Sequence, residues 1–289
     1  MELFVFQLLN GFSSAMFIWL VAAGLTIAFG VLGILNVAQG CLYMLGMFIA
    51  YTFYWNLGMN FALSVILTLI SVGICGFLLE RLFLRRVYAL PLEFQLILTF
   101  AFVYILQDAV RLGWAPVLLQ IPLKPHLLGG NITIPIISRA YPIYNLFIIT
   151  AGIAVFAIVW LILDKTWWGK TVRATASDRE MANAIGINIR TLFSAAFVLA
   201  AMVTAIGGAL AMPFTESTCQ VGAIVIPTTF VVTAVGTLGN LKGAFIAALL
   251  IGVVGSFATF YFPYLELFTM YAILAIVLIV RPQGIFGGG

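Results

Sequence analysis

Residues 3–79 contain no Asp, Glu, Lys or Arg, and this run constrains the fold more than any other feature of the sequence. As one continuous α-helix the run would be about 115 Å long, whereas the hydrocarbon core of a bilayer is about 30 Å thick. It must therefore cross a membrane several times. Helices satisfy their backbone hydrogen bonds one segment at a time in lipid, and the sequence lacks the alternation of an outer-membrane barrel. We predict an all-α, polytopic membrane protein with a single transmembrane domain over residues 1–289.

The composition agrees with this prediction. Hydrophobic residues make up 64% of the chain and charged residues 8%, which is far outside the range of soluble globular domains. We predict about eight or nine transmembrane helices, eight if one of the short segments is re-entrant. The predicted segments are 11–35, 41–60, 62–79, 94–115, 143–163, 192–213, 224–239, 243–262 and 264–280.

The distribution of Lys and Arg predicts the orientation of these segments. Because loops rich in Lys and Arg stay in the cytoplasm, the larger group of basic residues is assigned to the inside. This group is Arg81, Arg85, Arg86, Lys165, Lys170, Arg173, Arg179, Arg190, Lys242 and Arg281. Only Arg111, Lys124 and Arg139 fall on the other side. With nine crossings, the N-terminus lies outside the cell and the C-terminus lies in the cytoplasm.

Residues 164–190 form a polar segment that we interpret as an ordered cytoplasmic loop. Ser177 and Glu180 have the spacing of a capping box, which satisfies free backbone N–H groups at the start of a helix. Gly186 suits the left-handed conformation that ends many helices, and Asn188 is a suitable N-cap for a following helix. The pattern predicts a short helix of two turns between two membrane helices. Two interpretations stay open: a purely structural loop, and a docking surface for a soluble partner.

Two glycine-rich stretches interrupt the apolar sequence, one in each half of the chain. The first, GVLGILNVAQG, includes Asn36, Gln39 and Gly40, and the second, AVGTLGNLKG, includes Gly236, Thr237 and Asn240. Paired interruptions in corresponding places are typical of transporters in which broken helices line the substrate pathway. We predict that these six residues line a translocation pathway. The alternative is that the glycines only permit close packing of helices.

Two features concern the opposite side of the membrane. Residues 116–142 are rich in Pro and Gly, and Ile alternates with other residues near the end of this segment. We therefore expect an ordered extracytoplasmic loop with a short strand. It includes His126, the single histidine, which we expect to be a surface residue. Asp108 and Arg111 are three residues apart on one predicted span and are expected to form an ion pair.

The sequence lacks the residues for an enzyme or a self-powered pump. One His and scattered carboxylates do not provide a nucleophile, base and acid, and no His or Cys cluster has metal-ligand spacing. Gly169-Lys170-Thr171 resembles the end of a phosphate-binding loop, but Asp164 occupies the position of the required first Gly. We predict no catalytic residue, no metal and no cofactor in this chain. The energy for transport is expected to come from another subunit.

Several motifs, taken together, resemble the LivH-type permease of branched-chain amino acid ATP-binding-cassette (ABC) importers. They are GLTIAFGVLGILNVAQGCLYMLG, ERLFLRR, WWGKTVRATASDREMANAIGIN, AVGTLGNLKGAFIAALLIG and VLIVRPQGIFG, and they cover nearly the whole chain in the order of the family. The sequence departs from the family pattern in two places. In the first, Gln39 replaces its usual His and Val37 replaces its Phe. In the late turn, Thr237 and Asn240 replace Gly and Ser.

The resemblance implies a subunit of an ABC importer in the inner membrane of a prokaryote. A second homologous permease, two ATP-binding subunits that hold ATP and Mg, and an extracytoplasmic solute-binding protein would complete it. The short cytoplasmic helix would be the coupling helix that contacts an ATPase subunit, through Ser177, Asp178, Arg179, Glu180, Met181, Ala184 and Gly186. The implied substrates are branched-chain or other hydrophobic amino acids. Import of urea, short amides or aromatic and aliphatic acids is the alternative, and a self-sufficient carrier or channel is a further one.

Overall fold

The computed structural model describes residues 2–88, 90–114, 129–133 and 140–287. Each predicted apolar segment corresponds to a helix. These helices are α1 (Glu2–Leu32), α2 (Gln39–Tyr51), α3 (Phe61–Leu79), α5 (Leu92–Trp114), α6 (Ile143–Trp160), α9 (Ile189–Ala211), α10 (Val221–Val235), α11 (Leu241–Tyr261) and α12 (Glu266–Val280). Within the described residues, six apolar helices are long enough to cross a membrane, and α10 and α12 are shorter apolar helices. The prediction of an all-α, multi-pass membrane protein is confirmed.

Three of the helices continue into π-helical turns rather than ending at the last α-helical residue. Thr52–Asn56 extends α2, Glu80–Leu84 extends α3 and Leu161–Lys165 extends α6. At 1.5 Å per residue, α2 alone is about 20 Å long, which is shorter than the hydrocarbon core. The break at residues 33–38 therefore leaves α2 as a short helix held inside the bundle, where nearly all of its residues are buried.

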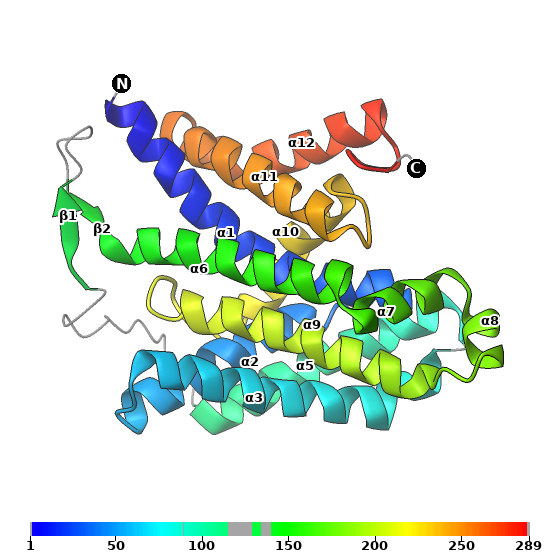
Figure 1. Ribbon diagram of the computed structural model, residues 1–289. Helices are drawn as coiled ribbons and strands as arrows, with labels where there is room; N and C mark the ends of the chain where they lie inside the picture. Colours follow the sequence, from blue (N-terminus) through cyan, green and yellow to red (C-terminus); the bar gives the residue numbers. More distant parts are fainter. Residues whose placement is uncertain (1, 89, 115–128, 134–139, 288–289) are drawn as a thin grey trace.

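Helices α1 and α9 form the centre of the bundle. Helix α1 packs along α11, α9, α10 and α6, and α9 packs on α2 and α3 (Figure 1). Most side chains of both helices are buried, although both are as apolar as membrane-exposed helices. Trp19 and Leu20 of α1 are fully buried in the largest hydrophobic cluster, together with Ala196 and Ala200 of α9. Small residues on α9 allow its neighbours to approach closely, as is common between membrane helices.

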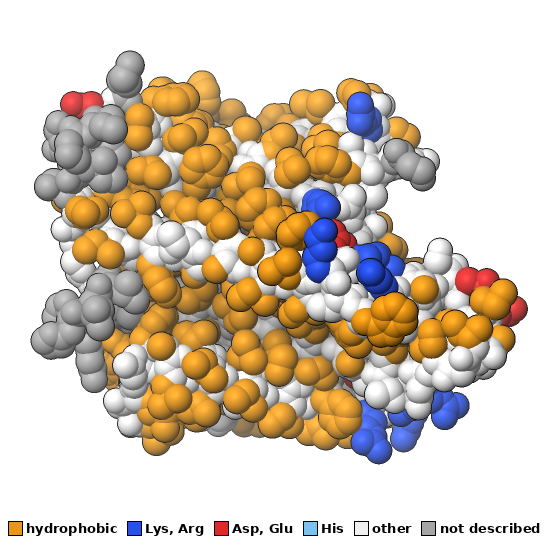
Figure 2. Space-filling model, viewed as in Figure 1, with side chains coloured by type: hydrophobic (Ala, Val, Ile, Leu, Met, Phe, Trp, Pro, Cys, Tyr) orange, Lys and Arg blue, Asp and Glu red, His pale blue; other side chains and the backbone are white. Residues whose placement is uncertain are grey.

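The two ends of the bundle differ in character. At one end, β1 (Asn131–Thr133) pairs antiparallel with β2 (Ala140–Pro142), which we call the hairpin end. The short strand predicted in loop 116–142 is confirmed, while residues 116–128, including His126, lie outside the described residues. At the other end lie α4 (Arg85–Val87), α7 (Trp167–Ser177) and α8 (Arg179–Ala184), and we call it the basic end. Figure 2 shows Lys and Arg side chains gathered toward this end of a largely hydrophobic face.

The expected ion pair between Asp108 and Arg111 is wrong. Both side chains are exposed on α5, and within the described ranges the ion pairs all involve Asp164. Asp108 and Arg111 lie near the end of α5, where water or headgroups can solvate each charge separately. At such a position, an ion pair is hardly more stable than two charges that are each solvated separately.

Candidate functional site

The polar segment 164–190 folds as two helices rather than the single one predicted. Thr166 caps α7, where its hydroxyl accepts a hydrogen bond from the Gly169 N–H (3.1 Å). Asp178 caps α8, where its carboxylate accepts from the Met181 N–H (2.9 Å). The predicted capping box of Ser177 and Glu180 is therefore wrong. Ser177 still has helical geometry as the last residue of α7, and the backbone becomes extended only at Asp178, so Asp178 is the residue that can cap.

The end of α8 agrees with the sequence. Gly186 has a φ of +86°, the left-handed conformation predicted for it, and the Asn188 side chain accepts from the Thr191 N–H at the start of α9. Ala182 packs inward, while Met181 and Ile185 are 61% and 69% exposed. Positions four apart lie on one face of a helix, so these two side chains form an apolar strip that Ala184 extends. The strip points into solvent at the basic end of the molecule.

Arg179 connects α8 to the centre of the bundle. Its guanidinium donates to the carbonyl oxygen of Leu32 (2.6 Å), the last residue of α1, and lies 5.1 Å from the centre of the Phe193 ring on α9. Carbonyl groups in the last turn of a helix lack partners within the helix, so a basic side chain there satisfies one and interacts well with the helix dipole. Helix α8 is thus fastened to α9 and to the point where α1 breaks.

Glu80 forms a second connection that the sequence did not reveal. Its side chain is fully buried in the turn after α3 and accepts hydrogen bonds from the hydroxyls of Tyr88 (2.8 Å) and Ser194. Burial and the neighbouring Glu80 carboxylate raise the pKa of the Tyr88 hydroxyl, which keeps it protonated as a donor. The Tyr88 ring also packs edge-on against Phe193. Glu80 therefore joins α3 to the same part of α9 that Arg179 contacts.

The first glycine-rich stretch forms a closed and buried polar network. The Asn36 amide donates to the side-chain oxygen of Gln39 (3.0 Å), and the Gln39 amide donates to the carbonyl of Ala200 (3.0 Å) and to the hydroxyl of Thr204. Both amide side chains are almost fully buried. Gly24 provides the space for this network, because a Cβ atom there would overlap the Thr204 and Gln39 side chains. The role of Asn36, Gln39 and Gly40 in lining a pathway stays a prediction.

The second glycine-rich stretch lies against the first. A Cβ atom on Gly30 would be only 3.0 Å from the Cα of Gly239, so the two stretches touch backbone to backbone. Asn240 caps α11 by accepting from the Gly243 N–H (3.1 Å). Thr237 has a φ of +76° and donates to the carbonyl of Gln283 near the C-terminus (2.9 Å). The interruptions in the two halves of the chain thus meet at one place, although the predicted pathway role of Gly236, Thr237 and Asn240 is not tested by this contact.

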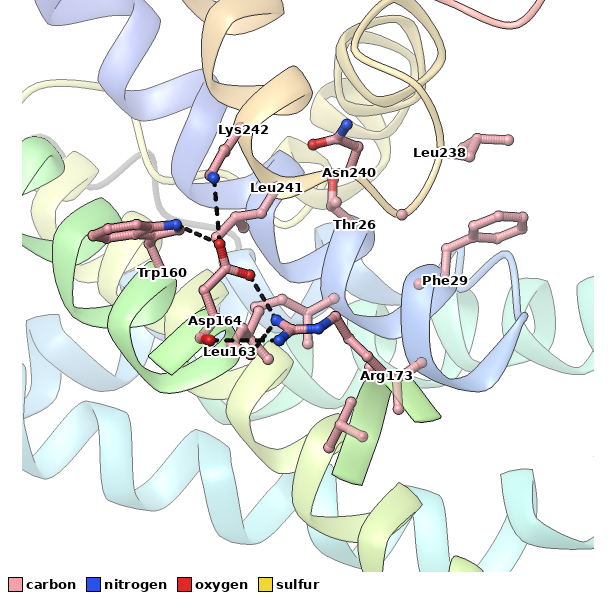
Figure 3. Close-up of a pocket in the computed structure, with 15 residues that line it drawn as sticks. Thr26, Phe29, Trp160, Leu163, Asp164, Arg173, Leu238, Asn240, Leu241 and Lys242 are labelled. Atoms are coloured by element: carbon pink, nitrogen blue, oxygen red, sulfur yellow. Dashed lines mark hydrogen bonds and ion pairs between the residues drawn. The ribbon is translucent and has the colours of Figure 1, made fainter. Parts of the chain in front are cut away.

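A cavity of about 640 Å³ opens beside these stretches, between α1, α6, α7 and α11. Asp164 is its polar centre (Figure 3). Its carboxylate accepts from the indole N–H of Trp160 (2.5 Å) and pairs with Arg173 (2.6 Å) and Lys242 (3.3 Å). Asp164 therefore ties the end of α6 to α7 and to the start of α11, and it neutralises part of the basic charge around the cavity.

The substitution Asp164→Asn is expected to weaken this contact between helices only slightly. All three charged side chains are at least one-third exposed, so the loss in stability should stay below about 1 kcal/mol and should shrink as salt is added. Thermal unfolding of the purified protein at low and high salt measures this effect. Glu216→Gln makes the same chemical change at an exposed carboxylate in the loop between α9 and α10, without an ion pair in the described part of the chain, and should leave the unfolding midpoint unchanged. A salt-independent loss of several kcal/mol would contradict the assignment.

The comparisons with known proteins identify the family. The family described as "Branched-chain amino acid transport system / permease component" matches residues 7–280. The chain belongs to this family. It is 28% identical to the high-affinity branched-chain amino acid transport system permease protein BraD of Pseudomonas aeruginosa, over 97% of this chain and 95% of that protein. It is 26% identical to the permease protein LivH of Escherichia coli K12, over 98% and 96% of the two chains.

Two further comparisons give weaker similarity. A probable LivH permease of Methanocaldococcus jannaschii is 23% identical over 93% of this chain and 88% of that protein. Comparison with the solved structure of PsaBC from Streptococcus pneumoniae in complex with a Fab gives a TM-score of 0.49 and 14% sequence identity. The matched region covers 96% of this chain and 92% of that chain. Membership in the permease family makes the chain a membrane transport protein, as the motifs in its sequence predicted.

Proposed function

We propose that this protein is one transmembrane subunit of an ABC importer that moves branched-chain or other hydrophobic amino acids across the inner membrane of a prokaryote. The family membership supports the transport role, and the geometry of α8 supports the ABC mechanism. Met181 and Ile185 give this short helix an exposed apolar strip at the basic end, which suits a surface that another protein covers. Since Arg179 fastens this helix to α1 and α9, a force applied to α8 would reach the centre of the bundle.

In this proposal the basic end is cytoplasmic and the hairpin end is outside, with the N-terminus outside and the C-terminus inside. Positive-inside bias supports this orientation, because the Lys and Arg side chains visible in Figure 2 lie toward the end that holds α7 and α8. A second permease subunit, two ATP-binding subunits and an external solute-binding protein would complete the importer. The coupling surface would comprise Ser177, Asp178, Arg179, Glu180, Met181, Ala184 and Gly186. ATP and Mg would be bound by the partner subunits.

The contact between the two glycine-rich stretches supports a pathway at their junction. When α1 moves relative to α9, the network of Asn36, Gln39 and Thr204 would open, and its amide groups would then face the solute. Gly40, Gly236, Thr237 and Asn240 would allow the backbone to adjust. The movement would be driven by the ATPase subunits through α8, because neither stretch contains an Asp, Glu or His that could bind and release protons during transport.

The proposal is tested by reconstituting the complete importer in liposomes. Uptake of radiolabelled leucine, isoleucine and valine should depend on ATP inside and on the binding protein outside, while urea and acetamide should not compete. ATP-dependent uptake of urea rather than leucine would replace the substrate assignment. Uptake of leucine by this chain alone, without ATP, would contradict the importer mechanism.

A further inference from the structure

A second cavity, of about 300 Å³, lies between α1, α10, α11 and α12 on the side of α1 that faces away from α6. Its lining comes from the middle of α1, the first half of α10, the second half of α11 and the start of α12, together with Tyr43 of α2. Because α10 and α12 end at the basic end and α11 starts there, these parts all belong to the half of the bundle nearer the hairpin end. The cavity is thus separate from the one around Asp164.

The lining combines an apolar wall with several hydroxyl groups. The lining residues are Ser14, Phe17, Ile18, Val21, Tyr43, Ile224, Val225, Thr228, Thr229, Ile251, Gly252, Gly255, Ser256, Thr259, Thr269 and Met270. None of these residues carries a charge. The lining therefore offers apolar side chains for packing and hydroxyl groups, each of which can donate and accept a hydrogen bond.

The hydroxyl groups keep capacity for a ligand. Thr229, Thr259 and Thr269 donate to carbonyl oxygens one turn earlier on their own helices, at 2.8–2.9 Å, which leaves their oxygen lone pairs available. Ser14 and Thr228 make no side-chain hydrogen bond to any described residue. Next to Thr228, Pro227 lacks an N–H, so the Ala223 carbonyl of α10 also loses its helical partner. Free polar groups in a membrane helix are costly unless a partner or water satisfies them.

Two glycines on α11 lie one turn apart but differ in the space around their missing Cβ atoms. A Cβ atom on Gly252 would be 2.6 Å from the backbone of Ala15, so Gly252 is needed for the close contact of α11 with α1. A Cβ atom on Gly255 would meet no atom within 4 Å. Packing therefore does not explain a glycine at position 255, whereas an open cavity beside α11 does.

We propose that this cavity holds the transported solute in the outer half of the membrane, and that the solute is a small molecule without net charge that carries an apolar side group. The inference rests on the proposed function and assigns its substrate site. An amino-acid zwitterion fits this chemistry, since its aliphatic side chain can pack on Ile18, Val21 and Ile251 while hydroxyl groups contact its charged ends. A solute with net charge would lack a counter-charge in the cavity, which is costly inside a membrane.

The substitution Gly255→Leu tests the site directly. The added side chain enters open space, so the helix should form as before, but it occupies the volume that the solute needs. We expect leucine uptake by the reconstituted importer to fall at least about tenfold. Gly113→Leu is the matched control, because Gly113 also lies in a helix with nothing within 4 Å of its missing Cβ, on α5 away from the cavity.

A second variant keeps the test decisive if the Gly255→Leu importer fails to assemble. Thr228→Val removes a hydroxyl that bonds to no described residue and preserves the shape of the side chain, and it should raise the KM for leucine at least about threefold. The inference is overturned if leucine uptake stays normal in Gly255→Leu, or if it falls equally in Gly113→Leu. An unchanged KM for leucine in Thr228→Val also overturns it. If the wild-type importer itself takes up no leucine, the proposed function fails instead, and these variants are not needed to show it.

Discussion

The substitution Ile185→Asp on α8 is expected to reduce ATP-driven uptake at least about tenfold while the permease itself stays folded. Ile185 is mostly exposed in this chain, so an aspartate there costs little in the isolated subunit. In the assembled importer the same position would lie in the groove of an ATPase subunit. A charge buried there without a partner typically costs about 2 kcal/mol or more of binding energy. Copurification of the ATPase subunit with the tagged permease, and ATP hydrolysis stimulated by the loaded binding protein, measure this loss.

The matched control is Asn183→Asp, which adds the same charge to the same helix. Asn183 lies two residues before Ile185, so its side chain points to a different face of α8 from the strip of Met181 and Ile185. We expect this variant to retain the ATPase subunit and most of its transport. Equal loss in both variants would indicate a general effect of charge. Normal copurification and transport in Ile185→Asp would show that the apolar strip is not the coupling surface.

The features that depend on local sequence could be predicted. Apolar runs longer than a bilayer crossing located the helices, and Gly186 and Asn188 were assigned to the correct ends because helix caps involve residues three or four positions apart. The N-cap of α8 was assigned to Ser177 instead of Asp178, because local sequence does not separate two neighbouring residues that can both cap a helix. Both are good caps, they are adjacent, and only the length of α7 decides which one leaves the helix first.

The features that depend on distant contacts could not be predicted. Arg179 reaches a carbonyl 147 positions earlier, and Glu80 accepts from Ser194, 114 positions later. Hydropathy and spacing place each residue on its helix without saying which helix lies opposite. Glu80 in particular reads as part of a basic loop, since three Arg residues follow it within six positions. The same limit applies to Gly24, which looks like any other small residue in a membrane helix.

The second large effect is expected for Gly24→Ala in the middle of α1. Alanine normally favours a helix over glycine by about 1 kcal/mol. Here the added methyl group would overlap the hydroxyl of Thr204 and the amide of Gln39, and it would lie 2.8 Å from the carbonyl oxygen of Ala200. Overpacking costs about 1–3 kcal/mol, and each buried polar group that loses its partner adds about 1–3 kcal/mol. The clash therefore outweighs the helix propensity, and we expect a net loss of about 3 kcal/mol.

Thermal unfolding of the purified permease in detergent measures this loss, with Gly255→Ala as the control. Gly255 has open space around its missing Cβ, so alanine there should leave the stability unchanged or raise it by up to about 1 kcal/mol. Thr204→Ala removes the nearest atom, so the double variant Gly24→Ala/Thr204→Ala should be more stable than the sum of the two single effects by about 1 kcal/mol or more. Strict additivity would mean that Gly24 and Thr204 are not in contact. A Gly24→Ala protein as stable as wild type would show that α1 and α9 lie farther apart than the Gln39 network requires.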